Sequence, residues 1–163
     1  MLSVITIFES INKPYRERVG VYIFKENKLL VGKIKTSSWS GYVVPGGGVD
    51  PGESLEDAAI RESKEELGVS IKNLKLISTN VKIKYDKEDK KYCGYNNSFF
   101  TADYDKDDTS LFNSEGDGYD KVEITIPELI SFFKLHAKKC EQNNDMFNSN
   151  TALLHIKNLN KLK

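Results

Sequence analysis

Cysteine, histidine, proline and tryptophan are scarce in this chain of 163 residues, which has two cysteines, two histidines, four prolines and one tryptophan. Cys93 and Cys140 lie far apart and lack the spacing of metal ligands. Neither a disulfide framework nor a cysteine-based zinc site is therefore expected. Two reduced thiols are typical of a cytoplasmic protein, and we expect that location.

An excess of charge of either sign is also missing. Lysine and arginine number 24, and aspartate and glutamate number 24. With no overall positive field, a nucleic-acid partner is not expected, whereas a small phosphorylated substrate neutralised by a metal remains compatible. The first nine residues have neither a basic region nor a long apolar run, so we expect no signal peptide and no membrane span.

Hydrophobic residues make up 39% of the chain and charged residues 29%, which fits one globular domain over 1–163. Its residues alternate between strand-like and helix-like segments. We therefore expect an α+β fold, an α/β/α sandwich with a mixed β-sheet between helices. The predicted strands lie at 4–8, 19–25, 29–34, 39–44, within 71–85, and at 92–104 and 122–126; helices are predicted from near 54 to 68, at 127–135 and at 151–162, with a polar linker at 138–150.

A glycine-rich loop stands ahead of the first predicted helix. Pro45 is followed by three glycines, which let a backbone approach a ligand closely. Ser54, with Asp57 three residues later, is typical of a helix N-cap, and Gly68 is typical of a helix end. The glycine-rich loop is thus expected to lead directly into the helix.

The same helix carries a cluster of carboxylates. Glu62 and Glu66 are one turn apart and share a face, which Glu65 borders. Hard oxygen ligands grouped in this way select Mg²⁺ or Mn²⁺, and a cation held there binds substrate phosphates through its remaining positions. The sequence therefore predicts a divalent metal site on this helix.

The spacing of these residues resembles the Nudix box, which runs Gly, five residues, Glu, seven residues, Arg-Glu, apolar, any residue, Glu-Glu, any residue, Gly, apolar. One position departs, because Ser63 stands where an apolar residue is usual. On a helix Ser63 points away from the glutamates, so it affects packing and leaves the catalytic face intact. The positions in register are Gly47, Glu53, Arg61, Glu62, Glu65, Glu66, Gly68 and Val69.

The resemblance implies an enzyme that hydrolyses a phosphoanhydride bond in a nucleoside diphosphate linked to another moiety, with Mg²⁺ or Mn²⁺ as cofactor. It implies that Glu62 and Glu66 are metal ligands. Glu65 would bind a metal directly or through water, and the carbonyl of Gly47 would complete the shell. Glu53 would support the site from behind.

The resemblance also implies catalytic roles. Arg61 would orient a glutamate through a charge-assisted hydrogen bond, with a simple helix ion pair to Glu65 as the alternative. The catalytic base varies within the family and stays open. It is Glu62 or Glu65 in the box, or Glu115 in the long acidic segment 103–120.

The substrate stays open among nucleoside triphosphates, nucleotide sugars and dinucleotides. Trp39 and Tyr42 are candidates for stacking on a base, and Tyr85 lies about where diadenosine polyphosphate hydrolases carry a tyrosine. Two other classes are weighed: a nucleotide-sensing module without turnover, and an RNA-end decapping hydrolase, which the neutral charge and short tails disfavour. Because many relatives dimerise, a homodimer is left open.

Overall fold

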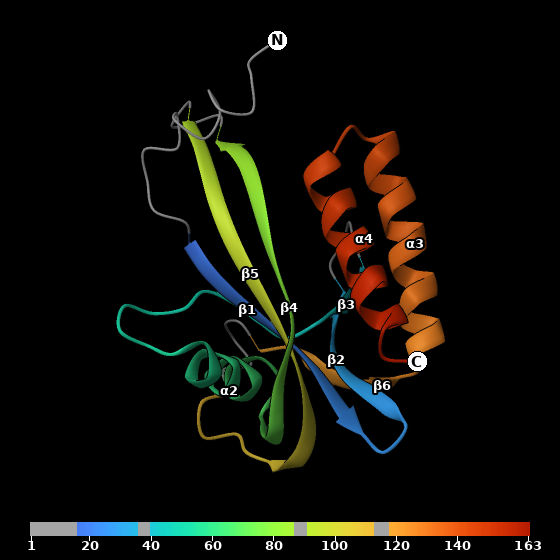
Figure 1. Cartoon of the computed structure of the whole chain (residues 1–163). Helices are drawn as coiled ribbons and strands as arrows, with labels where there is room; N and C mark the ends of the chain where they lie inside the picture. Colours follow the sequence, from blue (N-terminus) through green and yellow to red (C-terminus); the bar gives the residue numbers. More distant parts are fainter. Residues whose placement is uncertain (1–15, 36–39, 87–90, 113–117) are drawn as a thin grey trace.

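The computed structural model describes residues 16–35, 40–86, 91–112 and 118–163 (Figure 1). The strand predicted at 4–8 lies outside these ranges. The helices and strands follow the chain as β1 (Arg16–Lys25), β2 (Lys28–Lys35), β3 (Ser40–Val43), α2 (Leu55–Leu67), β4 (Val69–Asp86), β5 (Lys91–Asp107), β6 (Asp120–Ile124), α3 (Ile126–Gln142) and α4 (Met146–Asn160).

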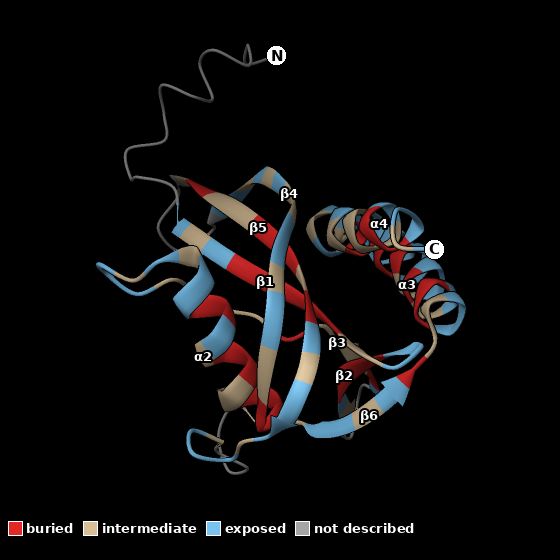
Figure 2. Cartoon of the chain, turned by 60° about the horizontal axis from the view of Figure 1, so that its bottom comes forward, coloured by how far each residue is buried: buried red, intermediate tan, exposed pale blue. Residues whose placement is uncertain are grey.

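The strands form one mixed sheet in the order β3-β2-β1-β5-β4, and β6 also pairs with β2. β1 runs parallel to β5, whereas the β1–β2, β2–β3, β2–β6 and β4–β5 pairs are antiparallel. Helix α2 lies on one side of the sheet, and α3 and α4 lie on the other (Figures 1 and 2). The predicted fold class, a mixed sheet between helices, is confirmed.

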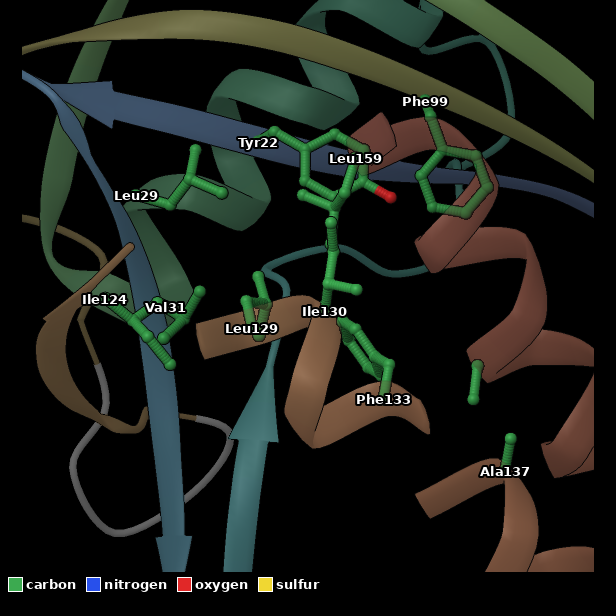
Figure 3. Close-up of a cluster of buried hydrophobic side chains, with 11 residues drawn as sticks. Tyr22, Leu29, Val31, Phe99, Ile124, Leu129, Ile130, Phe133, Ala137 and Leu159 are labelled. Atoms are coloured by element: carbon green, nitrogen blue, oxygen red, sulfur yellow. The ribbon is translucent and has the colours of Figure 1, made fainter. Parts of the chain in front are cut away.

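Both faces of the central strands are buried because helices cover both sides (Figure 2). Along β1 the side chains alternate, so that Val21 packs on the α2 side and Tyr22 packs on the opposite side. Phe100 and Phe99 of β5 divide in the same way. Figure 3 shows the larger cluster, in which Tyr22, Leu29, Val31, Phe99, Ile124, Leu129, Ile130, Phe133, Ala137 and Leu159 come together.

The C-terminal region is helical over more of its length than the sequence predicts. The prediction of a polar linker at 138–150 is wrong, because α3 continues to Gln142 and α4 begins at Met146. Cys140 and Ser149 are buried, and the Ser149 hydroxyl joins the two helices by donating to Glu141 Oε1 at 3.0 Å. None of the described helices is long and apolar enough to cross a membrane.

The long loop predicted at 103–120 is shorter than expected. β5 extends to Asp107 because its last residues pair with the first residues of β4, from Val69 to Lys72. Local sequence gives no sign of this pairing, since the segment is acidic and poor in β-branched residues. The connection to β6 therefore starts at Asp108.

Candidate active site

Helix α2 is fixed at both ends as its sequence predicts. The Ser54 hydroxyl accepts a hydrogen bond from the Asp57 amide at 3.0 Å, and Gly68 ends the helix in the left-handed conformation with φ 63°. The interior face of the helix is apolar except for Ser63, which is fully buried. Its hydroxyl donates to the Ala59 carbonyl at 2.7 Å, so a polar residue at this usually apolar position is satisfied within the helix.

The glycine loop is hydrogen-bonded to β1. The Val21 amide donates to the Pro45 carbonyl at 2.9 Å, and the Val19 amide donates to the Gly47 carbonyl at 3.0 Å. A methyl group on Gly46 would lie 2.1 Å from the Val19 carbonyl oxygen, so only glycine permits this approach. The Gly47 carbonyl thus already joins the loop to the sheet, and its role as a metal ligand stays a prediction.

Two glutamates of α2 face this loop. Glu62 and Glu66 are each 8% exposed. The Gly46 amide donates to Glu66 Oε2 at 2.8 Å, and a methyl group on Gly47 would lie 2.2 Å from Glu62 Oε1. Because neighbouring loop positions contact the two carboxylates, the structure brings Glu62 and Glu66 to one place.

Arg61 connects the carboxylates of the site. Its Nη1 donates to Glu62 Oε1 and to Glu65 Oε2, each at 2.9 Å. Its Nε and Nη2 donate to the two oxygens of Glu53, each at 2.9 Å, and Nη2 also donates to the Gly48 carbonyl at 2.8 Å. Arg61 therefore contacts Glu62 as well as its ion-pair partner Glu65, and its role in orienting a catalytic glutamate stays a prediction.

Charge and burial act in opposite directions on these carboxylates. Burial raises the pKa of Glu62, and Arg61 opposes that rise. The hydrogen bonds from Arg61, followed by the one from the Asp50 amide, lower the pKa of Glu53. A positive charge placed near Glu62 would therefore stabilise its ionised form.

The donor chemistry of this cluster fits a hard divalent cation, since two buried carboxylates lie beside a carbonyl-rich loop. Within the described ranges, however, no group of three or more His, Cys, Asp or Glu side chains is gathered closely enough to hold a metal by itself. Glu65 instead shares Arg61 with Glu62. The metal-ligand roles of Glu62, Glu65 and Glu66 therefore stay predictions.

The predicted aromatic residues are separated in the structure. Tyr42 packs edge-to-face on Phe132 at 5.2 Å and borders a cavity against α3 and α4. Tyr85 is 46% exposed and contacts Tyr92 at 5.1 Å, at the far end of β4. Trp39 and Glu115 lie outside the described residues.

Sequence reasoning missed a second group of polar residues beside the glycine loop. Arg18 of β1 pairs with Gly48 across an isolated antiparallel bridge. It borders a cavity that also contains Lys82 of β4 and Phe147 of α4. The one available signal was Arg18 itself, a charge placed directly before the apolar stretch of β1.

Comparison with known proteins identifies the family of this chain. The NUDIX domain model matches residues 14–139. An RNA pyrophosphohydrolase of Ruthia magnifica is 38% identical over 78 residues, which is 46% of this chain and 42% of the relative. One of Wolbachia pipientis is 47% identical over 57 residues, 34% of this chain and 35% of the relative. The chain therefore spans less than half the length of these relatives.

Solved structures share the fold. A MutT protein from Bacillus halodurans superposes with a TM-score of 0.58 at 19% identity, covering 72% of each chain. A Bacillus subtilis pyrophosphohydrolase gives 0.53 at 26% identity, covering 69% of this chain and 65% of that one. With the box helix, its carboxylates and the domain match in agreement, this chain belongs to the Nudix family.

Proposed function

We propose that this protein is a hydrolase that uses Mg²⁺ or Mn²⁺ to cleave a phosphoanhydride bond in a nucleoside diphosphate linked to another moiety. The observation that carries the proposal is the contact of Glu62 and Glu66 with adjacent residues of the glycine loop. Two buried carboxylates beside each other repel, and a bound cation would remove that cost. Family membership supports the same reaction.

A divalent cation bound there would neutralise phosphate charge and lower the pKa of a bound water. The chain's own residues position the parts. Glu66 is held by the Gly46 amide, and Arg61 fixes the direction of Glu62 and Glu65. Glu65, whose side chain is 36% exposed, is the box glutamate with most access to an attacking water. We propose that Glu65, Glu62 or Glu115 accepts the proton, and the greater access of Glu65 favours it.

A 5′-triphosphorylated RNA end is a second candidate substrate. The relatives named RNA pyrophosphohydrolases favour it over the sequence-based expectation of no nucleic-acid partner. That expectation used the net charge of zero, which averages over the whole chain. It does not describe the local surface beside the site, where Arg18, Lys82 and Lys84 gather.

The test is turnover of a substrate panel by the full chain with Mg²⁺, with Mn²⁺ and with chelator. The panel holds ATP, GTP, a nucleotide sugar, a dinucleoside tetraphosphate and a short RNA bearing a 5′-triphosphate. We expect metal-dependent release of phosphate, pyrophosphate or a nucleoside monophosphate from at least one. Full activity in chelator would contradict the metal role, and no turnover of any member would contradict the reaction.

The organisation of the chain remains a proposal as well. We propose a single domain over 1–163, which as a homodimer or a monomer acts in the cytoplasm. Both cysteines are free and buried, which supports a reducing compartment. Size-exclusion chromatography with light scattering would decide between monomer and dimer.

A further inference from the structure

A cationic groove lies between the sheet and α4. It is a cavity of about 310 Å³, within the range of small-molecule binding sites. Of the lining residues that the structure describes, three are cationic and none is acidic. The groove is lined by Arg18, Lys82, Lys84, Tyr95, Asn97, Phe147, Asn148 and Thr151.

Strand register explains why these residues meet. Arg18 of β1 lies opposite Asn97 of β5, and Lys82 of β4 lies opposite Tyr95 of β5. Residues two apart on a strand share a face, so Lys84 joins Lys82 and Asn97 joins Tyr95. The floor of the groove is therefore a patch of three adjacent strands, and α4 forms its wall.

Within the described parts of the chain, the positive charges in the groove form no ion pair with a carboxylate. Among the described residues, no carboxylate lies within ion-pair distance of Arg18, Lys82 or Lys84. Lys82 is half-buried and donates to the Phe147 carbonyl at 3.3 Å and to the Thr151 hydroxyl. Burial, and then the charge of Arg18, lower the pKa of Lys82 to about 8. A bound anion would relieve this repulsion.

Aromatic rings lie beside the charges. Phe147 packs against Tyr95 with ring centroids 6.2 Å apart. The Nζ of Lys82 lies 4.1 Å from the Phe147 ring centroid, and that of Lys84 lies 5.5 Å from it. Both aromatic residues are partly buried, and each lines the groove. A cationic groove lined by aromatic rings is the combination that binds the phosphates and bases of a nucleotide together.

The groove adjoins the carboxylate site. Arg18 pairs with Gly48, the residue whose carbonyl accepts from Arg61. Phosphates held at Arg18 would thus lie beside the glycine loop that Glu62 and Glu66 contact.

We propose that this groove binds the nucleoside end of the substrate, with Arg18 and Lys82 holding its phosphates and the rings of Tyr95 and Phe147 contacting its base. The inference rests on the proposed function and names the chemistry of the substrate, a nucleoside 5′-polyphosphate. Phe147, Asn148 and Thr151 lie beyond residues 14–139, the part matched by the family model. Helix α4 therefore contributes to substrate choice from outside the shared domain.

The first experiment measures binding of ATP and of inorganic triphosphate in chelator by titration calorimetry, so that turnover does not interfere. Arg18→Gln and Lys82→Gln should each weaken both ligands by about tenfold, the effect of losing one charge-assisted hydrogen bond. Phe147→Leu should weaken ATP and leave inorganic triphosphate unchanged. Arg18 is exposed, so its variant does not depend on repacking.

Matched controls come from the same elements. Lys75→Gln removes an exposed lysine of β4 outside the groove, and Leu153→Ala removes an exposed apolar side chain of α4. Both should bind like the wild type. Equal affinity of wild type, Arg18→Gln and Lys82→Gln for both ligands would overturn the groove proposal.

A second experiment asks whether the ligand is a free nucleotide or an RNA end, and it tests the groove proposal and the proposed reaction separately. ATP, an RNA with a 5′-triphosphate and the same RNA with a 5′-hydroxyl are compared for binding and for KM with Mg²⁺. If the triphosphate RNA binds more tightly than ATP and Phe147→Leu loses this difference, the groove binds RNA ends. If the two bind equally, the groove binds free nucleotides.

Glu66→Gln should lower kcat by about 10²-fold or more and keep ATP binding in chelator, because Glu66 lies outside the groove. If the wild type turns over a substrate and the groove variants have the same KM, the groove proposal is wrong and the proposed reaction stands. If binding depends on the groove but no panel member is turned over, the proposed reaction is wrong and the groove proposal stands.

Discussion

The guanidinium of Arg61 holds the carboxylate of Glu53 by two hydrogen bonds of 2.9 Å, from Nε to Oε1 and from Nη2 to Oε2. Glu53 stands before the helix N-cap, and it also accepts the Asp50 amide at 3.0 Å. This two-point contact sets the plane of the guanidinium. Its remaining nitrogen, Nη1, is thereby directed at Glu62 and Glu65.

Arg61→Lys should lower kcat by about 10- to 100-fold, because an ammonium group cannot make the two-point contact, and residues that orient metal ligands commonly have effects of this size. Glu53→Gln should lower kcat by a smaller factor. If both act through the same contact, the double variant should fall no further than Arg61→Lys. Lys72→Gln, which breaks an exposed pair with Asp105, is the control and should be unchanged.

The three loop glycines should respond differently to alanine. Gly46→Ala should unfold the protein at lower temperature, because its methyl group would meet the β1 backbone. Gly47→Ala should keep the fold and lose activity, because its methyl group would displace only the flexible end of Glu62. Gly48→Ala meets nothing within 4 Å and serves as the control. Thermal unfolding and turnover, measured in parallel, check the order.

Glu66→Gln should lose about 10²-fold or more in kcat, the scale of a lost catalytic positioning element, while the fold survives. The change is nearly isosteric and keeps an oxygen to accept the Gly46 amide. Circular dichroism and metal titration accompany the kinetics. Wild-type turnover with unchanged metal affinity would show that Glu66 is not part of the site.

Stability should fall in acid through His155. Its Nδ1 lies 2.8 Å from the Tyr22 hydroxyl and its ring stacks on Phe133 at 4.5 Å. Burial, and then the charge of Lys82, lower the pKa of His155 from 6.5 to about 3. The folded state thus keeps a neutral ring while the unfolded state takes up a proton, so stability is present above pH 6.5 and is lost as the pH falls toward 3.

The slope from this one group is at most about 1.4 kcal/mol per pH unit. His155→Gln removes that proton uptake and should flatten the curve over the same window. Urea unfolding of both proteins at several pH values gives the difference, in which carboxylates common to the two cancel. Parallel curves would mean that His155 takes up its proton equally in the folded and unfolded states, so that its pKa is not lowered by folding.

The role of Glu115 as the catalytic base stays a prediction from the sequence, since the residue lies outside the described ranges. If it accepts the proton of the attacking water, Glu115→Gln should lower kcat by about 10²-fold and change KM less. If kcat stays within a factor of about two, worth ~0.4 kcal/mol, the base is Glu62 or Glu65.

The sequence predicted correctly those features whose contacting residues lie close together in the chain. The caps at Ser54 and Gly68, the shared face of Glu62 and Glu66, and the strand pattern of β1 all depend on contacts within a few residues. The end of α3 was misplaced because its last turns are polar. One contact that holds them comes from α4, where the Ser149 hydroxyl donates to Glu141 Oε1 at 3.0 Å, and no local pattern reveals it.

The sequence alone therefore determined the family, the helix that carries the carboxylates and the order of most strands. Only the tertiary structure decided that the glycine loop is bonded to β1, and that Arg18, Lys82 and Phe147 line one groove. The reason is physical: a helix fixes its side chains by a 3.6-residue repeat, whereas strand register and helix docking join positions far apart in the chain.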